Sequence, residues 1–236
     1  MRFTDPDGMG PNDIVFFNMQ GQETNRIESN TVFKTYVEDG NVDLSRTYLN
    51  YAEAEMPNVM QTRVGNGGQI EDVTATKYQA NDYQIAASTY LTNKELNSGF
   101  MQVVNRGGNI IPSSNLESVP DISVDKVKAW SMQETHAGTD NGSSGILQVN
   151  VGGDYTNDKA GLGITKGATF SAHQEINLAI RYAIGKGFTS DGKGNYTWQG
   201  WTEALRRFGP GSKDKEYQNK INTMEQNSRE PNPTDY

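Results

Sequence analysis

Glu134 and Trp130 are the two side chains of this 236-residue chain whose spacing could support acid–base chemistry. They lie four residues apart at the end of a helical pattern, which places both on one face of the expected helix. A carboxyl group held against an aromatic ring, away from water, has a raised pKa and can keep its proton near neutral pH. Such a group can protonate the leaving oxygen of a glycosidic bond. The same spacing fits a solvated glutamate at a helix end, which is the commoner outcome on spacing alone.

Three helical patterns in the second half of the chain would position this pair. Apolar residues recur at helical spacing through 124–134, 176–184 and 201–208. Ser171 and Gln174 have the spacing of a capping box just before the second pattern. A Gly-Pro-Gly stop signal follows the third pattern. We therefore expect a small, mainly helical domain.

The first half of the chain has different patterns. Residues 12–38 are predicted to form short strands with a turn at Gly21, whereas 43–63 and 71–96 have mostly helical patterns. Two apolar runs around Arg-Gly-Gly-Asn in 100–112 predict a β-hairpin. The predicted fold class is α+β, in three parts: an N-terminal region of short strands and helices at 1–117, the mainly helical domain at 118–221, and a disordered tail at 222–236.

Composition and charge exclude several classes of function. The chain has no cysteine, which rules out disulfides, thiolate chemistry and cysteine zinc sites. Its net charge of -8 argues against a general nucleic-acid binder, and no stretch is apolar and long enough for a membrane span. Residues 1–117 hold 8 basic and 15 acidic side chains, whereas 161–221 hold 9 basic and 5 acidic. The C-terminal part could meet an anionic polymer, or its charges could be scattered over solvated helix faces.

The residues around Glu134 resemble the lysozyme-like superfamily, in particular goose-type lysozymes and lytic transglycosylases. The stretch "ETHAG" is followed by a small-residue loop, by "GILQV" and by a helix end "ALRRFGPG", in the order of that family's motifs. The resemblance covers roughly residues 120–221, under half of the chain. It implies a lysozyme-like helical fold that cleaves the β-1,4 bond between N-acetylmuramic acid and N-acetylglucosamine in peptidoglycan. Glu134 would be the general acid of this reaction.

The same resemblance assigns residues that bind the glycan strand. Gln148 would contact the glycan, and Asn150, Phe208 and Trp130 would line the same substrate-binding site. Phe208 stands where the family usually has a tyrosine, and Gly209 stands where it usually has an asparagine. These two departures concern substrate binding and leave the assignment of the general acid unchanged.

Hydrolysis and transglycosylation differ in the base that they need. Hydrolysis with inversion needs a second carboxylate, ~6.5–9.5 Å from the acid, to activate water. Goose-type enzymes are thought to supply aspartates at two positions. Asp140 matches the first position, but the second is occupied by Asn150, which cannot act as a base. Asp154 follows nearby in the sequence. Attack by the sugar's own hydroxyl needs only Glu134, as acid and then as base. Lytic transglycosylation, with 1,6-anhydro-muramyl products, is therefore slightly favoured.

The opening stretch "FTDPDGM" is the basis of a second resemblance. Asp5 to Met9 resemble the motif that ends the Rhs/YD-repeat core of polymorphic toxins, where a variable C-terminal effector is released. The resemblance implies an Rhs-type carrier and an immunity protein as partners. The N-terminus has no apolar segment typical of a signal peptide, so a carrier would have to export the chain to the periplasm or cell wall. A Pro-Asp-Gly turn is also an ordinary loop device.

Two rival functions stay open at this point. The chain could be a non-catalytic glycan-binding or structural module of a surface or Rhs-type protein. It could also be a toxin whose activity resides in residues 12–117. Its two histidines, His136 and His173, lack the carboxylate spacing of a zinc site, so neither a metal nor another cofactor is expected.

Overall fold

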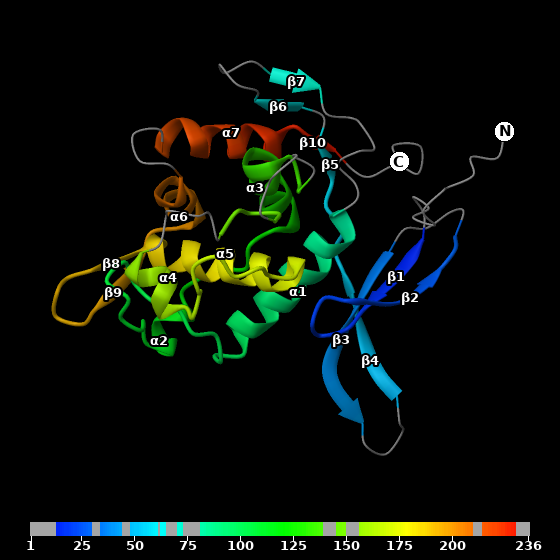
Figure 1. Cartoon of the computed structure of the whole chain (residues 1–236), viewed down its shortest axis with the longest axis horizontal. Coiled ribbons are helices and arrows are strands. Elements are labelled where there is room, and N and C mark those ends of the chain that lie inside the picture. Colours follow the sequence, from blue (N-terminus) through cyan, green and yellow to red (C-terminus); the bar gives the residue numbers. More distant parts are fainter. Residues whose placement is uncertain are drawn as a thin grey trace.

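The computed structural model describes residues 13–29, 34–43, 48–60, 62–64, 70–72, 81–138, 145–149, 156–209 and 214–229. Within these ranges the fold is α+β, which confirms the predicted fold class (Figure 1). The helices are α1 (Asp82–Asn97), α2 (Ser113–Leu116), α3 (Val124–Thr135), α4 (Asn157–Gly161), α5 (Ala172–Gly187), α6 (Trp201–Phe208) and α7 (Asp214–Gln226). The strands are β1 (Ile14–Phe17), β2 (Glu23–Ile27), β3 (Lys34–Asp43), β4 (Tyr48–Ala54), β5 (Val59–Met60), β6 (Thr62–Val64), β7 (Ile70–Asp72), β8 (Phe188–Ser190), β9 (Tyr196–Trp198) and β10 (Ser228–Arg229).

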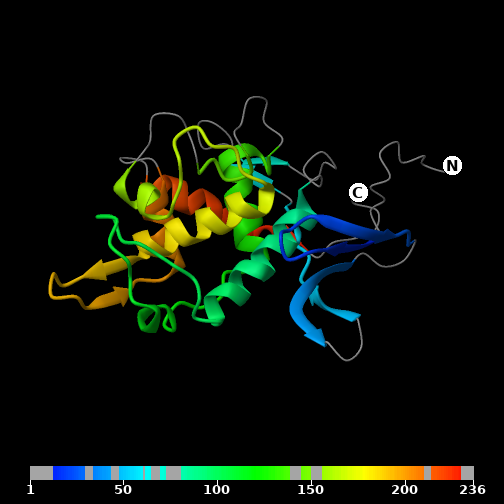
Figure 2. The same ribbon diagram turned by 60° about the horizontal axis from the view of Figure 1, so that its bottom comes forward.

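Strands β1 to β4 form one mixed sheet in the order β2-β1-β3-β4. Strand β1 pairs antiparallel with β2 and parallel with β3, and β3 pairs antiparallel with β4. The sheet lies against α1, which separates it from the remaining helices (Figure 2). A small cluster joins the sheet to this helix; its buried members are Val15, Phe17, Val37, Ala54, Tyr83, Ala87 and Leu91.

The N-terminal segment predictions have mixed outcomes. Short strands at 12–38 are confirmed where the structure describes that segment, as β1, β2 and the start of β3. The helical prediction for 43–63 is wrong, because β4, β5 and β6 occupy the described part of it. Lys34 of β3 and Glu53 of β4 form an ion pair between the two strands, with their charged atoms 2.8 Å apart. Such cross-strand pairing overrides local helical propensity.

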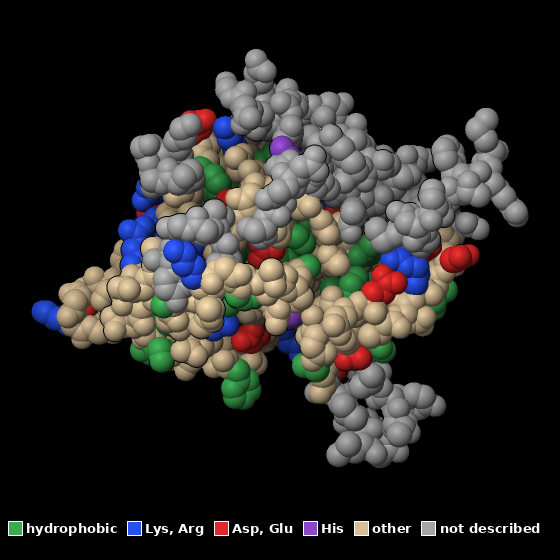
Figure 3. Space-filling model, viewed as in Figure 1, with side chains coloured by type: hydrophobic (Ala, Val, Ile, Leu, Met, Phe, Trp, Pro, Cys, Tyr) green, Lys and Arg blue, Asp and Glu red, His purple; other side chains and the backbone are tan. Residues whose placement is uncertain are grey.

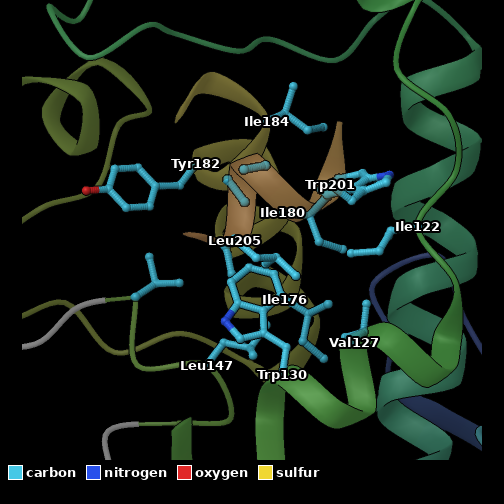
Figure 4. Close-up of a cluster of buried hydrophobic side chains, with 14 of the residues drawn as sticks. Ile122, Val127, Trp130, Leu147, Ile176, Ile180, Tyr182, Ile184, Trp201 and Leu205 are labelled. Atoms are coloured by element: carbon cyan, nitrogen blue, oxygen red, sulfur yellow. The ribbon is translucent and has the colours of Figure 1, made fainter. Parts of the chain in front are cut away.

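Helix α5 packs against α1 and α6 at the centre of the helical body. The predicted capping box at its start is confirmed, since the Ser171 and Gln174 side chains each accept a hydrogen bond from the other residue's backbone N–H. The apolar stripe behind it, which includes Ile176, Ile180 and Ile184, is fully buried (Figure 4). The sequence therefore correctly locates the helix at the centre of the core.

Helix α1 belongs to the helical body, so the predicted domain boundary between residues 117 and 118 is wrong. Ile85, Ala86 and Leu96 pack in the same large cluster as the side chains of α3, α5, α6 and α7. The helix predicted at 71–96 begins only at α1, after strand β7. The opposite side of α1 carries the sheet, so this one helix contributes to both clusters of buried residues.

Two further segment predictions are corrected. Helix α7 continues past residue 221, Met224 is fully buried, and β10 pairs with β5. The tail predicted from residue 222 is therefore wrong for 222–229, and 230–236 lie outside the described residues. The hairpin predicted at 100–112 is present but shorter than predicted: Val104 and Ile110 form an antiparallel bridge, the N–H of Asn105 donates to the carbonyl of Asn109 at 2.8 Å, and the N–H of Ile111 donates to the carbonyl of Val103 at 2.9 Å.

A buried ion pair fixes α3 against α1. Lys128 donates to the Asp82 carboxylate, and both side chains are almost completely buried. Burial lowers the pKa of Lys128 to about 7, so the adjacent carboxylate is needed to favour its charged form. The Asn81 amide donates to the carbonyl of Ala137 at 2.5 Å, just beyond the end of α3. Helix α1 thus holds both the middle and the end of the helix that carries Glu134.

Candidate active site

Glu134 lies in the last turn of α3, where the helix ends abruptly. Ser123 caps the start of this helix by accepting a hydrogen bond from the backbone N–H of Lys126 at 3.1 Å. The next two residues after the helix, His136 and Ala137, both have left-handed backbone angles, with φ of 49° and 56°. The C-terminal end of a helix carries a partial negative charge, which disfavours a carboxylate placed there.

The environment of Glu134 raises its pKa to about 7. Burial is the largest cause, because it penalises the charged form. The Tyr217 hydroxyl donates a hydrogen bond to Oε1 and lowers the pKa. The nearby Trp130 indole N–H also lowers the pKa, although it does not complete a hydrogen bond. The charge of Glu175 raises the pKa, and the charge of Lys159 lowers it. Glu134 can therefore keep its proton near neutral pH.

Trp130 lies beside Glu134, as their spacing predicts, but its role differs from the predicted one. Its side chain is fully buried among Leu147, Ile176 and other core residues (Figure 4). The prediction that Trp130 binds the substrate is wrong, because a fully buried ring cannot reach a glycan strand. It forms instead part of the wall that keeps water from the carboxyl group.

Phe208 supports this wall from α6. Its ring meets the Trp130 ring edge to face, with centroids 4.7 Å apart, and contacts Tyr182 in the same manner at 5.5 Å. Phe208 is half-buried, so part of its surface is still open to solvent. A role in glycan binding for this residue stays a prediction.

The "GILQV" segment lies against the end of α3. The Thr135 hydroxyl donates to the carbonyl of Ile146 at 2.6 Å. The Gln148 side-chain amide donates to the backbone carbonyl of Glu134 at 3.2 Å, and this glutamine is only partly buried. Gln148 is thus beside the candidate acid and accessible, as a glycan contact requires.

Two residues near Glu134 were missed by the sequence reasoning. Tyr217 comes from α7, and the recurrence of Tyr217, Ile221 and Met224 at helical spacing could have revealed that helix. Glu175 stands in the first turn of α5, next to the buried stripe, and is only 2% exposed. A charged residue next to an apolar stripe is the signal that could have marked it for attention.

Three predicted site residues lie outside the described residues. They are Asp140, Asn150 and Asp154, so the structure does not place a base for hydrolysis. The two histidines lie in different parts of the fold. His136 follows the end of α3, whereas His173 packs against the β1–β2 turn at Gly21. In the part of the chain that the structure describes, no group of three or more His, Cys, Asp or Glu side chains could hold a metal ion.

The basic side chains of the C-terminal part are unevenly placed on the surface. Lys and Arg gather on the side of the molecule where α6 and the β8–β9 hairpin lie (Figure 3). Two of them, Arg206 and Arg207, bind the Glu203 carboxylate at 2.6 Å and hold its pKa down at about 2. The described helices include none that is long and apolar enough to cross a membrane. Comparisons of the chain with family models, with curated proteins and with solved structures give no match, so a function must be argued from this geometry alone.

Proposed function

We propose that this chain cleaves the β-1,4 glycosidic bonds of peptidoglycan, with Glu134 as the general acid. One observation carries the proposal: a half-buried carboxyl group stands at the end of a helix, and desolvation raises its pKa to about 7. A general acid works best when its pKa lies near the working pH. Burying a carboxyl group also costs stability, which favours a chemical role over an idle glycan-binding or structural module.

The reaction begins with proton transfer from Glu134 to the glycosidic oxygen. The C–O bond breaks as the leaving sugar takes this proton, and positive charge develops on the ring that remains. The Glu134 carboxylate formed in this step can then accept a proton from the attacking hydroxyl group. Gln148 lies beside the acid, and we propose it as a contact to the glycan together with Phe208 and Asn150.

The identity of the attacking hydroxyl group decides the products. Among the described residues, Glu175 is the carboxylate whose charge acts on Glu134, but it is buried and accepts backbone N–H groups, so it is not available to activate water. We therefore propose attack by the sugar's own hydroxyl and 1,6-anhydro-muramyl products, which defines a lytic transglycosylase. Asp140 and Asp154 are the candidates for a base if water attacks instead.

Delivery outside the cytoplasm is part of the same proposal. Peptidoglycan is the substrate, so the chain would act in the periplasm or cell wall. Asp5 to Met9, which resemble the end of an Rhs core, lie outside the described residues. An Rhs-type carrier would export the chain, and an immunity protein would protect the producing cell.

Replacing Glu134 by Gln tests the proposal directly. Gln keeps the shape but cannot deliver a proton, so clearing of purified sacculi should fall by about 10²–10⁴-fold. The activity of the wild type should also fall as pH rises through about 7, since the protonated form is the active one. Mass spectrometry of the soluble products should show muropeptides lighter by one water than hydrolysis products.

The exposed Glu216 of α7 gives a matched control. A Glu216→Gln variant should clear sacculi like the wild type, and thermal unfolding should confirm that both variants are folded. Wild-type clearing by a folded Glu134→Gln variant would reject the assignment. Products with free reducing ends would reject the transglycosylase route and leave a hydrolase.

A further inference from the structure

We propose that Glu175 is a positioning residue of this site: its carboxylate holds the backbone of residues 146–149 against the end of α3, where this segment presents Gln148 beside Glu134. The inference rests on the proposed function, because it concerns the same acid. It adds a second carboxylate with a different task, which neither the sequence motifs nor their resemblance assigns.

Glu175 receives several backbone N–H groups at one point. Its Oε2 accepts the N–H of Ile146 at 2.6 Å and its Oε1 accepts the N–H of Leu147 at 3.0 Å. The N–H groups of Gln148 and Val149 favour its charged form as well. Converging backbone N–H groups form a concave site for an anion. Here the anion is a side chain of the protein itself, delivered from the first turn of α5.

Gly145 makes this close approach possible. A Cβ atom at position 145 would lie 1.9 Å from Oε2 of Glu175, and the glycine has a φ of 106°. Both the contact and the backbone angle therefore demand glycine. Gln148 follows with a left-handed φ of 50°, which a non-glycine residue adopts at some cost. A strained segment of this kind persists only when its surroundings hold it, and Glu175 supplies two of the hydrogen bonds that do so.

The segment held by Glu175 is joined to the candidate acid. Thr135 donates to the carbonyl of Ile146, and Gln148 donates to the carbonyl of Glu134. Residues 146–149 thus lie between the two carboxyl groups and connect α5 to the end of α3. Loss of the Glu175 contacts would release the segment that presents Gln148 beside Glu134.

Charge gives a second link between the two carboxyl groups. The titratable groups that bear on Glu134 come from three other elements: Lys159 of α4, Glu175 of α5 and Tyr217 of α7. Among them, Glu175 is the one that raises the Glu134 pKa, while Lys159 and Tyr217 lower it. Removing the Glu175 charge therefore shifts the Glu134 pKa downward.

The two environments separate the roles of the two carboxyl groups. Burial raises the pKa of both, but backbone N–H groups oppose this shift at Glu175 and stabilise its carboxylate. Both carboxylate oxygens of Glu175 accept backbone N–H groups, which suits a fixed anion, whereas Glu134 is the carboxyl group that the proposed reaction uses as a proton donor.

The test compares the full-length wild type with Glu175→Gln. Gln has the same shape, but it has no charge and places an NH₂ group against backbone donors. We expect kcat to fall on the order of 10²-fold, since small displacements of a site cost this much, and the alkaline limb of the pH profile to move to lower pH. A ¹³C NMR titration of the Glu134 side chain should move in the same direction. A variant that only weakened the fold would lose activity without shifting this titration.

Two further variants keep the test decisive. Glu175→Asp keeps the charge but shortens the reach, so kcat should fall while the Glu134 titration stays close to that of the wild type; it also replaces Glu175→Gln if that variant does not fold. Glu95→Gln removes a charge from the α1–α5 interface, where Glu95 accepts from Asn177 at 2.6 Å, and should change neither readout. An unshifted Glu134 titration in Glu175→Gln would overturn the inference. So would a Glu175→Asp variant that keeps both the wild-type kcat and the wild-type Glu134 titration. The NMR titration needs no substrate, so a wild type inactive on sacculi would reject the proposed function without deciding the role of Glu175.

Discussion

The other helices of the body pack on one side of α1 and the N-terminal sheet packs on the opposite side. The two regions differ in the size of the hydrophobic cluster that they bury there. The body side of the helix contributes Ile85 and Ala86 to a large cluster that also contains Trp130. The sheet side contributes Ala87 and Leu91 to a much smaller cluster. The sheet could not bury its inner face without α1, whereas the body surrounds its own site. Under the proposed function, the body holds the active site and the sheet is attached to it through α1.

The charged groups of the two regions show the same separation. In the described residues, the groups that shift the pKa of Glu134 all belong to the body. Charged groups of the sheet bind one another: Arg26 binds Asp13 at 2.9 Å and Glu23 at 2.8 Å, next to the ring of Tyr83. Changes in the sheet should therefore alter stability without altering the chemistry at Glu134.

Removal of α1 should have the largest effect. A chain shortened to residues 118–236 lacks the apolar side chains of α1 and leaves Lys128 buried without Asp82. Loss of one partner of a buried ion pair alone costs about 3–5 kcal/mol, and the lost apolar contacts add to it. We expect no cooperative thermal unfolding transition by circular dichroism and no clearing of sacculi.

A chain that begins at residue 56 is the control for this truncation. It lacks the four-stranded sheet but keeps α1, the β5–β10 pair and the hydrogen bonds from Asn58 to Asp125 at 2.6 Å. It should unfold cooperatively at a lower Tm and retain activity that depends on Glu134. Cooperative unfolding of the 118–236 chain would show that the body does not need α1.

Matched substitutions on the two sides of α1 should differ in how much they lower the free energy of unfolding. This difference should be smaller than the effect of removing α1. Large-to-small substitutions of buried Leu or Ile cost about 2–5 kcal/mol, depending on how well the site can collapse. Ile85→Ala should lie near the upper end, because this side chain is fully buried in the large cluster. Leu91→Ala should lie near the lower end, because the small cluster at the sheet can close around the gap. Urea unfolding gives both values, and an equal or larger cost for Leu91→Ala would contradict the difference between the regions.

Sequence patterns succeeded where a helix has one buried stripe and clear ends. The period of α5, its Ser171–Gln174 capping box and the face shared by Trp130 and Glu134 all depend on residues close together in the chain. Helix α1 is buried on both sides, so it has only a weak amphipathic pattern, and the domain boundary was misplaced for that reason. The sequence of β4 alone predicts a helix, because a local pattern does not reveal its pairing with β3.

The candidate site shows the same limit. Glu134 was found because its own motif is local, whereas Tyr217 reaches it from 83 positions further along the chain. Glu175 acts on a segment that lies 28 and 29 positions before it. No period or spacing in one sequence specifies such contacts, since they depend on how α3, α5 and α7 pack. Local chemistry could therefore be predicted, but the groups that adjust it could not.

Tyr217→Phe should give the smallest effect and a shift opposite in sign to that of Glu175→Gln. The Tyr217 hydroxyl donates to the Glu134 carboxylate and so favours the charged form. Without it, the pKa of Glu134 rises, and the alkaline limb of the pH profile should move to higher pH. The loss of one hydrogen bond is worth about 1 kcal/mol, so kcat at the optimum should fall only several-fold. Tyr36→Phe is the control from the sheet, where the Tyr36 hydroxyl contacts Glu53 at 3.4 Å. The pH profile of Tyr36→Phe should match that of the wild type, and a shifted profile would show that the sheet and the site are coupled. A downward shift in Tyr217→Phe would show that the Tyr217 hydroxyl does not stabilise the Glu134 carboxylate.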